Sequence, residues 1–295
     1  MITKRVAMQQ LEGIEYRQFA QSELHYIQVS NAFCEAKIAL QGGQILEFYS
    51  KMQQRHLLWL SELNQYVVAK AIRGGIPLCF PWFGAHETEQ DFPAHGFARN
   101  LTWQCQDIVM DDFGHHITLQ LSDSEQSRKY WNYAFNLQMV IHCEEVLRLE
   151  FKLQNLDHQA FDFAFAWHSY FPAQITGARI TGLEGQFYID QLDQNQIKHQ
   201  TEHAIKFDAE LDRVYPLTKM NFVLEQSPQT YINIQSTAQS AVIWNPWVDK
   251  AKRMADVADE AWRDFVCIEC GQMASAKQCL NAGASIQFEL TISGA

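Results

Sequence analysis

The chain has 295 residues, with 23 Lys plus Arg against 34 Asp plus Glu and a formal net charge of -11. This acidic balance argues against nucleic acids and anionic membranes as partners, because both bind proteins through basic surfaces. The sequence contains no apolar run of roughly 18 residues, the length that a membrane-spanning helix requires. Its start, MITKRVAMQQLEG, lacks the apolar stretch of a signal peptide. We therefore expect neither nucleic acid nor membrane among its partners.

Seven cysteines are scattered among apolar residues, a pattern typical of reduced core thiols in a cytoplasmic protein. Cys267 and Cys270 form a C-x-x-C spacing, but the surrounding FVCIEC is β-branched and aromatic and predicts a strand. Side chains three positions apart on a strand face opposite sides of the sheet. No cluster of histidines, cysteines and carboxylates has metal-ligand spacing along the chain, so we expect neither a metal site nor a cofactor.

Short alternating segments, separated by turn residues, follow one another along the chain. The segment 122–131, SDSEQSRKYW, has a capping-type start and predicts one or two helical turns. Strands are expected within 24–60 and at 101–109, 117–121, 134–153, 160–168, 178–190, 229–236, 240–245, 264–270 and 285–293. So many short strands with little helical periodicity predict an all-β fold, a sandwich of large antiparallel sheets with few short helices, as a single domain over 1–295.

The segment 71–100, AIRGGIPLCFPWFGAHETEQDFPAHGFARN, is apolar but too rich in glycine and proline for a regular element. Buried irregular segments that carry charged residues often line a site, and this one carries Arg73, His95 and Arg99. Two guanidiniums suit a phosphate or a carboxylate, which they grip through forked hydrogen bonds. The alternative is that each arginine pairs with an acidic residue at a strand end.

The segment AFDFAFAWHSYF at 160–171 places large aromatic side chains on one face of a strand and small residues leading to His168 on the other. Small side chains beside a histidine leave room for a ligand, although a satisfied structural histidine is the alternative. Glu269 lies in the apolar strand 264–271, where a carboxylate is costly to bury without a partner. It is either paired with an arginine or exposed in a cavity as a base or binding group.

Two further segments add candidate ligand contacts. Asp212, in LDRVYPL, is a candidate acceptor for hydroxyl groups. Trp244 and Trp247, in VIWNPW, offer flat apolar faces on which sugar rings often stack, although buried tryptophans are equally common. A histidine and a glutamate on separate strands make an acid/base pair that requires no metal and no nucleophile.

Six motifs carry a family resemblance that spans roughly residues 35 to 290: IRGGIPLCFPWFG, PAHGFARN, AWHSYF, DRVY, VIWNPW and FVCIECG. In this order they resemble the hexose-6-phosphate mutarotases, the glucose-6-phosphate 1-epimerases of the wider aldose 1-epimerase group. The resemblance implies a galactose mutarotase-like β-supersandwich that interconverts the α and β anomers of a hexose 6-phosphate.

The resemblance also implies a role for each candidate residue. His168 would be the general acid on the ring oxygen, Glu269 the general base on the anomeric hydroxyl, and His95 a support on the ring-oxygen side. Asp212 would hold sugar hydroxyls, and Arg73 and Arg99 would bind the phosphate. Ala94, before His95, replaces a glutamine of some relatives. Reference pKa values predict an ionised Glu269 at neutral pH and require an environment that protonates His168.

Two alternatives remain open at this level. A non-catalytic sugar-phosphate sensor would not require both His168 and Glu269. An aldose 1-epimerase for unphosphorylated sugars would not require Arg73 and Arg99. The expected partner is a small-molecule sugar phosphate; the oligomeric state is open, with a monomer favoured, and the preferred hexose is not specified.

Overall fold

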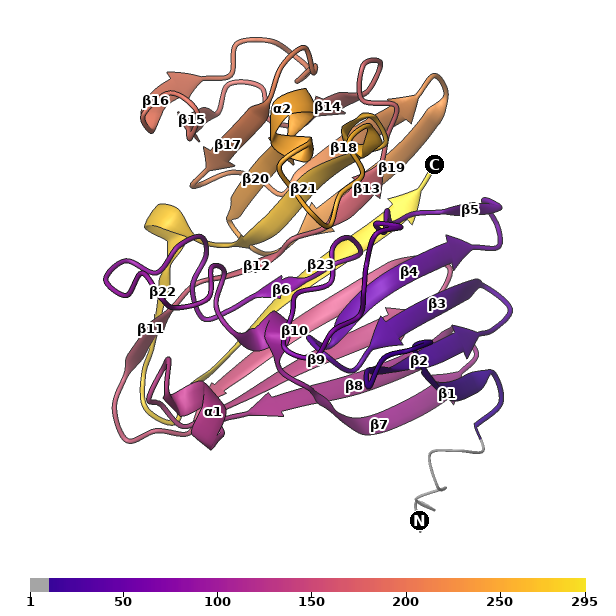
Figure 1. Ribbon diagram of the computed structural model, residues 1–295, viewed down its shortest axis with the longest axis vertical. Helices are drawn as coiled ribbons and strands as arrows, with labels where there is room; N and C mark the ends of the chain where they lie inside the picture. Colours follow the sequence, from indigo (N-terminus) through magenta and orange to yellow (C-terminus); the bar gives the residue numbers. More distant parts are fainter. Residues whose placement is uncertain (1–10) are drawn as a thin grey trace.

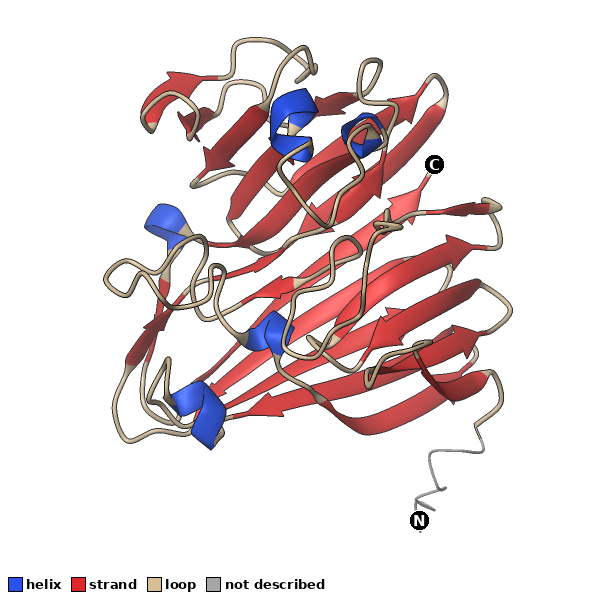
Figure 2. Cartoon of the chain, viewed as in Figure 1, coloured by secondary structure: helices blue, strands red, loops and turns tan. Residues whose placement is uncertain are grey.

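Residues 11–295 are described in the computed structural model of the protein, and they form antiparallel β-sheets with a few short helices (Figures 1 and 2). The N-terminal sheet has five strands in chain order: β1 (Ile14–Gln18), β2 (His25–Ser30), β3 (Cys34–Ala39), β4 (Gln44–Ser50) and β5 (Arg55–His56). Leu57 and the segment after it lead into the glycine- and proline-rich passage over the third sheet.

The second sheet has eight strands. Its order is β14 (Arg179–Thr181), β18 (Asn221–Ser227), β19 (Thr230–Ser236), β23 (Ser285–Gly294), β10 (Leu147–Asn155), β9 (Phe135–Cys143), β8 (Gly114–Ser122) and β7 (Gln104–Asp111). Along β10 and β23, buried and partly exposed residues alternate, as expected for a sheet that covers a core with one face.

The third sheet carries the segments with the candidate site. Its order is β16 (Gln196–His199), β15 (Phe187–Asp190), β17 (Leu211–Tyr215), β20 (Ser240–Asn245), β21 (Phe265–Gln272), β12 (Phe165–Trp167) and β6 (Leu78–Cys79), with β13 (Tyr170–Pro172) also paired to β21. A separate two-stranded ribbon is formed by β11 (Phe161–Phe163) and β22 (Gln278–Leu280).

The helices are short: α1 (Glu125–Arg128), α2 (Trp247–Ala251) and the 3-10 turns Ala98–Asn100, Ala261–Arg263 and Ala274–Ala276. The helical turn predicted within 122–131 is confirmed as α1, which begins with a capping box between Ser124 and Ser127. No helix among residues 11–295 is long and apolar enough to cross a membrane.

One hydrophobic core joins the three large sheets, and Figure 1 shows the first and third sheets side by side along the second. Phe165 of β12 stacks on Phe151 of β10 with ring centroids 4.1 Å apart, and it contacts Phe288 of β23 at 5.0 Å. The all-β prediction and the aromatic core face of 160–168 are therefore confirmed. That residues 1–295 form one domain stays a prediction, and residues 1–10 lie outside the described part.

Two expected strands differ in the structure. The strand expected at 160–168 breaks at Ala164, because the Ala164 N–H donates to the carbonyl of Pro81 at 2.8 Å and the chain passes from one sheet to another. The strand expected at 178–190 is divided between β14 and β15 by a turn at Gly182 and Gly185, both with positive φ. All seven cysteines are free, Cys267 and Cys270 included.

Candidate active site

A cavity of about 310 Å³ lies over the third sheet and gathers most of the predicted site residues. Its lining consists of Arg73, Phe83, Gly84, His95, His168, Gln191, Asp212, Val242, Trp244, Lys250, Met254 and Glu269. Five of the six predicted residues are in this set, and Arg99 is not. The volume is within the range of small-molecule sites, and charged side chains project into it from strands of the sheet and from the loop above.

His168 and Glu269 come together because their strands are neighbours. In the register of β12 and β21, Trp167 pairs with Cys270, so the next residue on one strand faces the preceding residue on the other. The His168 N–H donates to the carbonyl of Pro77 at 2.9 Å, which fixes the histidine backbone just after β12 ends. Imidazole Nε2 then lies 3.4 Å from carboxylate Oε1.

Both side chains are buried and each keeps a polar atom free. The His168 side chain is 9% exposed and the Glu269 side chain 2%. Among the described residues, His168 Nδ1 and Glu269 Oε2 have no hydrogen-bond partner. Buried polar atoms are normally satisfied, so two unsatisfied atoms on one cavity wall indicate a ligand. This favours the site interpretation over a satisfied structural histidine.

The environment shifts both groups toward their neutral forms. Burial raises the pKa of Glu269 well above its usual value, with the nearby Asp212 carboxylate adding to the rise. Burial lowers the pKa of His168, and His95, Arg99 and Arg73 add to that effect. Relative to the reference values, the cavity therefore disfavours the charged form of each side chain. A protonated Glu269 beside a neutral His168 contains one titratable proton. An ionised Glu269 beside a protonated His168 contains the same number.

His95 enters the cavity from a backbone turn with φ of +65°. The next residue must be glycine, because a Cβ on Gly96 would meet the carbonyl oxygen of Phe80 at 2.0 Å. Burial, together with Arg99 and Arg73, lowers the pKa of His95 to about 3, so the ring is neutral at physiological pH. Its Nδ1 accepts from the Gly84 N–H at 3.3 Å, which places the ring proton on Nε2. Nε2 of His95 is therefore a hydrogen-bond donor. The ring centroids of His95 and His168 lie 5.6 Å apart.

Arg73 is held by protein groups on two sides. Its Nε and Nη2 lie 3.0 and 2.9 Å from Asp256 Oδ2, and its Nη1 donates to the Tyr170 hydroxyl at 2.8 Å. The Tyr170 ring in turn stacks on His168, with centroids 4.9 Å apart and planes 7° apart. Arg73 is therefore paired with an acidic residue, as the alternative interpretation of the arginines predicted. Its contacts also fix the ring plane of His168.

Arg99 has a different environment. Its Nη2 donates to the Ala94 carbonyl at 2.8 Å, while its buried Nε has no partner. Among residues 11–295 no carboxylate lies within ion-pair distance of this guanidinium. Although Arg99 does not line the cavity, its charge is close enough to lower the pKa of His95 and His168. It is therefore a cation near the site that no acidic residue in the described part of the chain neutralises.

Asp212, on β17, also lines the cavity. Burial raises its pKa to about 6, although Lys250 opposes the shift from 3.8 Å. The Lys250 ammonium also lies 3.0 Å from Glu210 and 5.5 Å from the centre of the Trp244 ring. The sequence analysis missed Lys250, which lies in α2 three residues after VIWNPW ends. Its closeness in sequence to Trp244 was the available signal. It also missed the exposed Gln191.

The two tryptophans of VIWNPW separate in the structure. Trp244 lines the cavity with its ring 6.1 Å from that of His168. Trp247, the first residue of α2, packs on Trp262 at 4.3 Å and is partly buried against the core. Only the first of the pair is therefore available to a ligand in this cavity.

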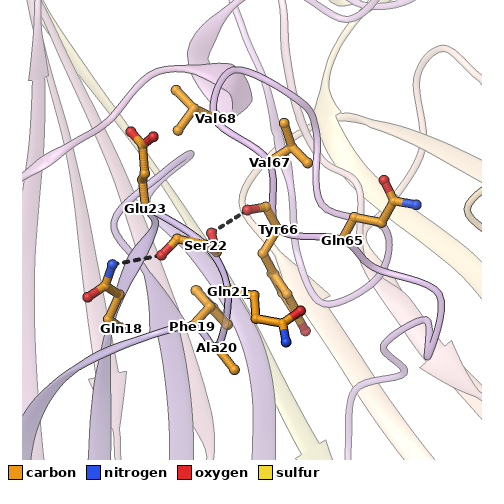
Figure 3. Close-up of a pocket in the computed structure, with 10 residues that line it drawn as sticks. All are labelled: Gln18, Phe19, Ala20, Gln21, Ser22, Glu23, Gln65, Tyr66, Val67 and Val68. Atoms are coloured by element: carbon orange, nitrogen blue, oxygen red, sulfur yellow. Dashed lines mark hydrogen bonds between the residues drawn. The ribbon is translucent and has the colours of Figure 1, made fainter.

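A larger depression of about 800 Å³ lies elsewhere, between the β1–β2 turn and the 65–68 loop (Figure 3). Its floor is made by Phe19 and Tyr66, whose rings stack 4.0 Å apart, and Glu23 is its one carboxylate. It contains no histidine and no cation. Size alone favours this depression, but chemistry favours the smaller cavity, which holds an acid/base pair and charged groups.

Comparison with known proteins agrees with this fold. The sequence profile of aldose 1-epimerase matches residues 25–293. A Salmonella typhimurium protein provisionally named glucose-6-phosphate 1-epimerase is 32% identical over 250 residues, which cover 84% of this chain and 83% of that protein. A similarly named protein from Cenchrus ciliaris is 32% identical over 248 residues, covering 80% and 74% of the two chains.

Solved structures give the same result. The crystal structure of YeaD, provisionally named a mutarotase, from Salmonella typhimurium superimposes with a TM-score of 0.90 at 30% identity, covering 98% of this chain and 96% of that one. A galactose mutarotase-like protein from Lactobacillus casei has a TM-score of 0.73 at 15% identity, covering 92% and 100%, and shares the fold. The predicted galactose mutarotase-like sandwich is confirmed, and the chain belongs to the aldose 1-epimerase family.

Proposed function

We propose that this enzyme interconverts the α and β anomers of a hexose 6-phosphate, most directly glucose 6-phosphate. The observation that carries the proposal is the His168–Glu269 pair, which is buried at a cavity wall with one unpartnered atom on each side chain. Mutarotation requires one proton to be added at the ring oxygen and one to be removed from the anomeric hydroxyl. A pair that shares one proton matches this requirement.

In the proposed mechanism, His168 protonates the ring oxygen while Glu269 takes the proton of the anomeric hydroxyl. The bond between C1 and the ring oxygen breaks, and the open-chain aldehyde forms. Rotation about C1–C2 presents the other carbonyl face, and the reverse proton transfers close the ring. The pair regains its original proton count, so no proton is exchanged with solvent overall. General acid/base assistance of this kind contributes about 10²–10⁴-fold to the rate.

The starting protonation state is the step that the electrostatics affect most. The free cavity favours neutral His168 and neutral Glu269. Because the neutral pair and the ion pair differ by one proton transfer, we propose that bound sugar converts the first into the second. A phosphate dianion near His168 would stabilise its imidazolium, and a hydroxyl donating to Glu269 would stabilise its carboxylate.

The remaining cavity residues are proposed to position the sugar. His95 would donate from Nε2 on the ring-oxygen side, Asp212 would accept from sugar hydroxyls, and Trp244 would offer an apolar face. Arg99 is proposed as the principal phosphate partner because no carboxylate neutralises it. Arg73 is a secondary phosphate partner, since Asp256 already pairs with its guanidinium.

Three observations support this function over the alternatives. The family relatives from Salmonella typhimurium and Cenchrus ciliaris are provisionally named for glucose-6-phosphate 1-epimerase. A sensor would need no unsatisfied acid/base pair, and an epimerase for plain sugars would need no unneutralised guanidinium. Saturation-transfer NMR of the anomeric protons tests the proposal with glucose 6-phosphate, galactose 6-phosphate and glucose. We expect accelerated exchange for a phosphorylated sugar; acceleration of glucose alone, or binding of the phosphate without acceleration, would refute it.

A further inference from the structure

A second group of histidines and carboxylates lies on the second sheet, away from the cavity. His116 of β8 and His142 of β9 are direct cross-strand partners, and their side chains are on the face opposite the core residues Ile117 and Ile141. Glu144 follows β9 directly. Together His116, His142 and Glu144 offer three ligand atoms within 4.8 Å of one another. Sequence spacing could not reveal this group, because strand pairing brings positions 116 and 142 together.

The ring nitrogens of the two histidines face each other at short distance. His116 Nδ1 lies 2.7 Å from His142 Nδ1. The other nitrogen of each ring is beside a carboxylate: His142 Nε2 lies 2.7 Å from Glu150 Oε1, and His116 Nε2 lies 3.0 Å from Asp111 Oδ2, the latter not aligned as a hydrogen bond. The Glu150 carboxylate favours the N–H of a neutral His142 on Nε2, so its Nδ1 presents a lone pair toward His116. At this distance the two Nδ1 atoms either share a proton, with His116 as the donor, or face a common cation.

The geometry fits a metal ion of the zinc type. Glu144 Oε1 lies 3.6 Å from Nδ1 of His116 and 3.6 Å from Nδ1 of His142. A triangle with sides of 2.7, 3.6 and 3.6 Å has a circumscribed radius of about 1.9 Å, so an ion just above its plane is about 2.0–2.1 Å from all three atoms. Those are the bond lengths of Zn²⁺ to imidazole nitrogen and carboxylate oxygen. Water would complete the coordination.

The surrounding charges also favour a cation. Three carboxylates, on Asp111, Glu144 and Glu150, face two cations, on Arg148 and Lys152. Arg148 is the competitor for the metal position, because its Nη2 lies 3.0 Å from His142 Nδ1 and 3.4 Å from Glu144 Oε1. An incoming metal ion must displace this guanidinium, which can still pair with Glu150 through Nη1 at 2.9 Å.

We propose that His116, His142 and Glu144 form a divalent-metal site of the zinc type, with Asp111 and Glu150 orienting the two imidazoles. The site would join β8, β9 and the start of the link to β10. It is independent of the anomer chemistry, and its expected effect is on stability, because an ion that binds the folded chain and not the unfolded chain stabilises the fold.

The test is calorimetric titration of the full chain with Zn²⁺ alone, after dialysis against a chelator. We expect one equivalent to bind, with affinity lowered at least about tenfold in Glu144→Gln and in His142→Gln. Glu145→Gln, which removes the neighbouring exposed carboxylate, is the matched control and should bind as the wild type does. Arg148→Met should bind more tightly, because it removes the competing cation.

Two further measurements test whether the metal ion binds at Glu144. Co²⁺ should show a visible absorption band on binding to the wild type and not on addition to Glu144→Gln. Zn²⁺ should raise the melting temperature of the wild type but not of Glu144→Gln, which removes a carboxylate that is 18% exposed and lies on the face opposite the core. Equal Zn²⁺ affinity in wild type and Glu144→Gln, or no binding by wild type and Arg148→Met, would overturn the proposal in favour of a proton shared by the two histidines.

Discussion

The protein contains two groups in which histidine lies beside glutamate, and they differ in whether cations pair with the glutamate. In the cavity, His168 and Glu269 touch each other at 3.4 Å and each keeps a buried atom without a partner. On the second sheet, His142 is bounded by Glu150 at 2.7 Å and Arg148 at 3.0 Å, and Glu150 also pairs with Lys152 at 2.6 Å.

This difference separates the proposed acid/base pair from a charged network. In the network, three carboxylates and two cations pair with one another. Burial acts to raise the pKa of Glu150, but the contacts with Lys152 and His142 outweigh it and lower that pKa. In the cavity, no such cation touches Glu269 and burial raises its pKa. A carboxyl group whose proton is easily exchanged with its neighbour is suited to proton transfer, whereas a neutralised carboxylate is suited to fixing geometry.

The largest effect is expected from removing the cavity pair. His168→Asn should lower kcat for anomer exchange by about 10²–10⁴-fold, because acid assistance at the ring oxygen is lost. The double variant His168→Asn/Glu269→Gln should be little worse, since residues that act as a unit are far from additive. Exchange rates from NMR, with binding followed by the phosphorus resonance, check this. Losses that multiply would show that the two side chains act in separate steps.

The next largest effect concerns the two arginines. Arg99→Ala should mainly raise KM for glucose 6-phosphate, by about 30–150-fold for a lost charge-assisted contact of roughly 2–3 kcal/mol. The phosphate charge is the same in ground and transition states, so kcat should change little. Arg73→Ala should lower kcat as well, because Tyr170 loses the contact that holds it against His168.

Steady-state rates on phosphorylated and plain glucose distinguish these roles. Activity on plain glucose should be unaffected by Arg99→Ala and reduced by Arg73→Ala. Equal losses on both sugars in Arg99→Ala would make that arginine structural, and the phosphate assignment would be lost.

A smaller effect is expected from pH. The working pair holds one proton, so the acidic limb of kcat/KM should follow the lowered pKa of His168, and the alkaline limb the raised pKa of Glu269. Activity should therefore persist above pH 6.5 and fall about tenfold per unit only above the raised pKa. A profile of kcat/KM from pH 4 to 10 checks this. A fall as pH rises through about 6.5, as an ordinary imidazolium would give, contradicts the one-proton pair.

The smallest effect is on stability. A group whose pKa is higher in the folded than in the unfolded state contributes stability that is fully present below its unfolded-state pKa. That stability is lost as the pH rises through its folded-state pKa. Glu269 is such a group, so Glu269→Gln should match the wild type at low pH and exceed it at alkaline pH, by a few degrees in melting temperature. Calorimetry at several pH values measures the difference. A variant less stable than wild type at alkaline pH would mean that the ionised carboxylate is held by favourable contacts.

The cavity residues were predictable because each carries its own local signal. His168 follows a run of alternating aromatic and small residues, and Glu269 is a lone carboxylate in an apolar strand; both indicate a polar side chain placed in a core for a reason. Their motifs also carried the family resemblance. Neither the exposure of the side chains nor the unpartnered atoms could be predicted, since both depend on neighbouring strands.

The features that sequence analysis missed depend on contacts across the fold. The break at Ala164 arises from a hydrogen bond to Pro81, which lies in another motif. His116 and His142 are 26 positions apart and meet only in the register of β8 and β9. The partner of Arg73, Asp256, lies 183 positions away in a segment without any motif. Alternation within one segment predicts a face of a strand but not which strand lies beside it.

The most direct test compares Glu269→Gln with Glu144→Gln, the same substitution in the two histidine–carboxylate groups. Saturation-transfer NMR measures anomer exchange of glucose 6-phosphate in each variant and in the wild type at one pH. We predict that Glu269→Gln retains phosphate binding but loses at least about 10²-fold in exchange rate, whereas Glu144→Gln exchanges as the wild type does. Near-normal exchange in Glu269→Gln, or an equal loss in both variants, would contradict the assignment of the cavity pair as the catalytic acid and base.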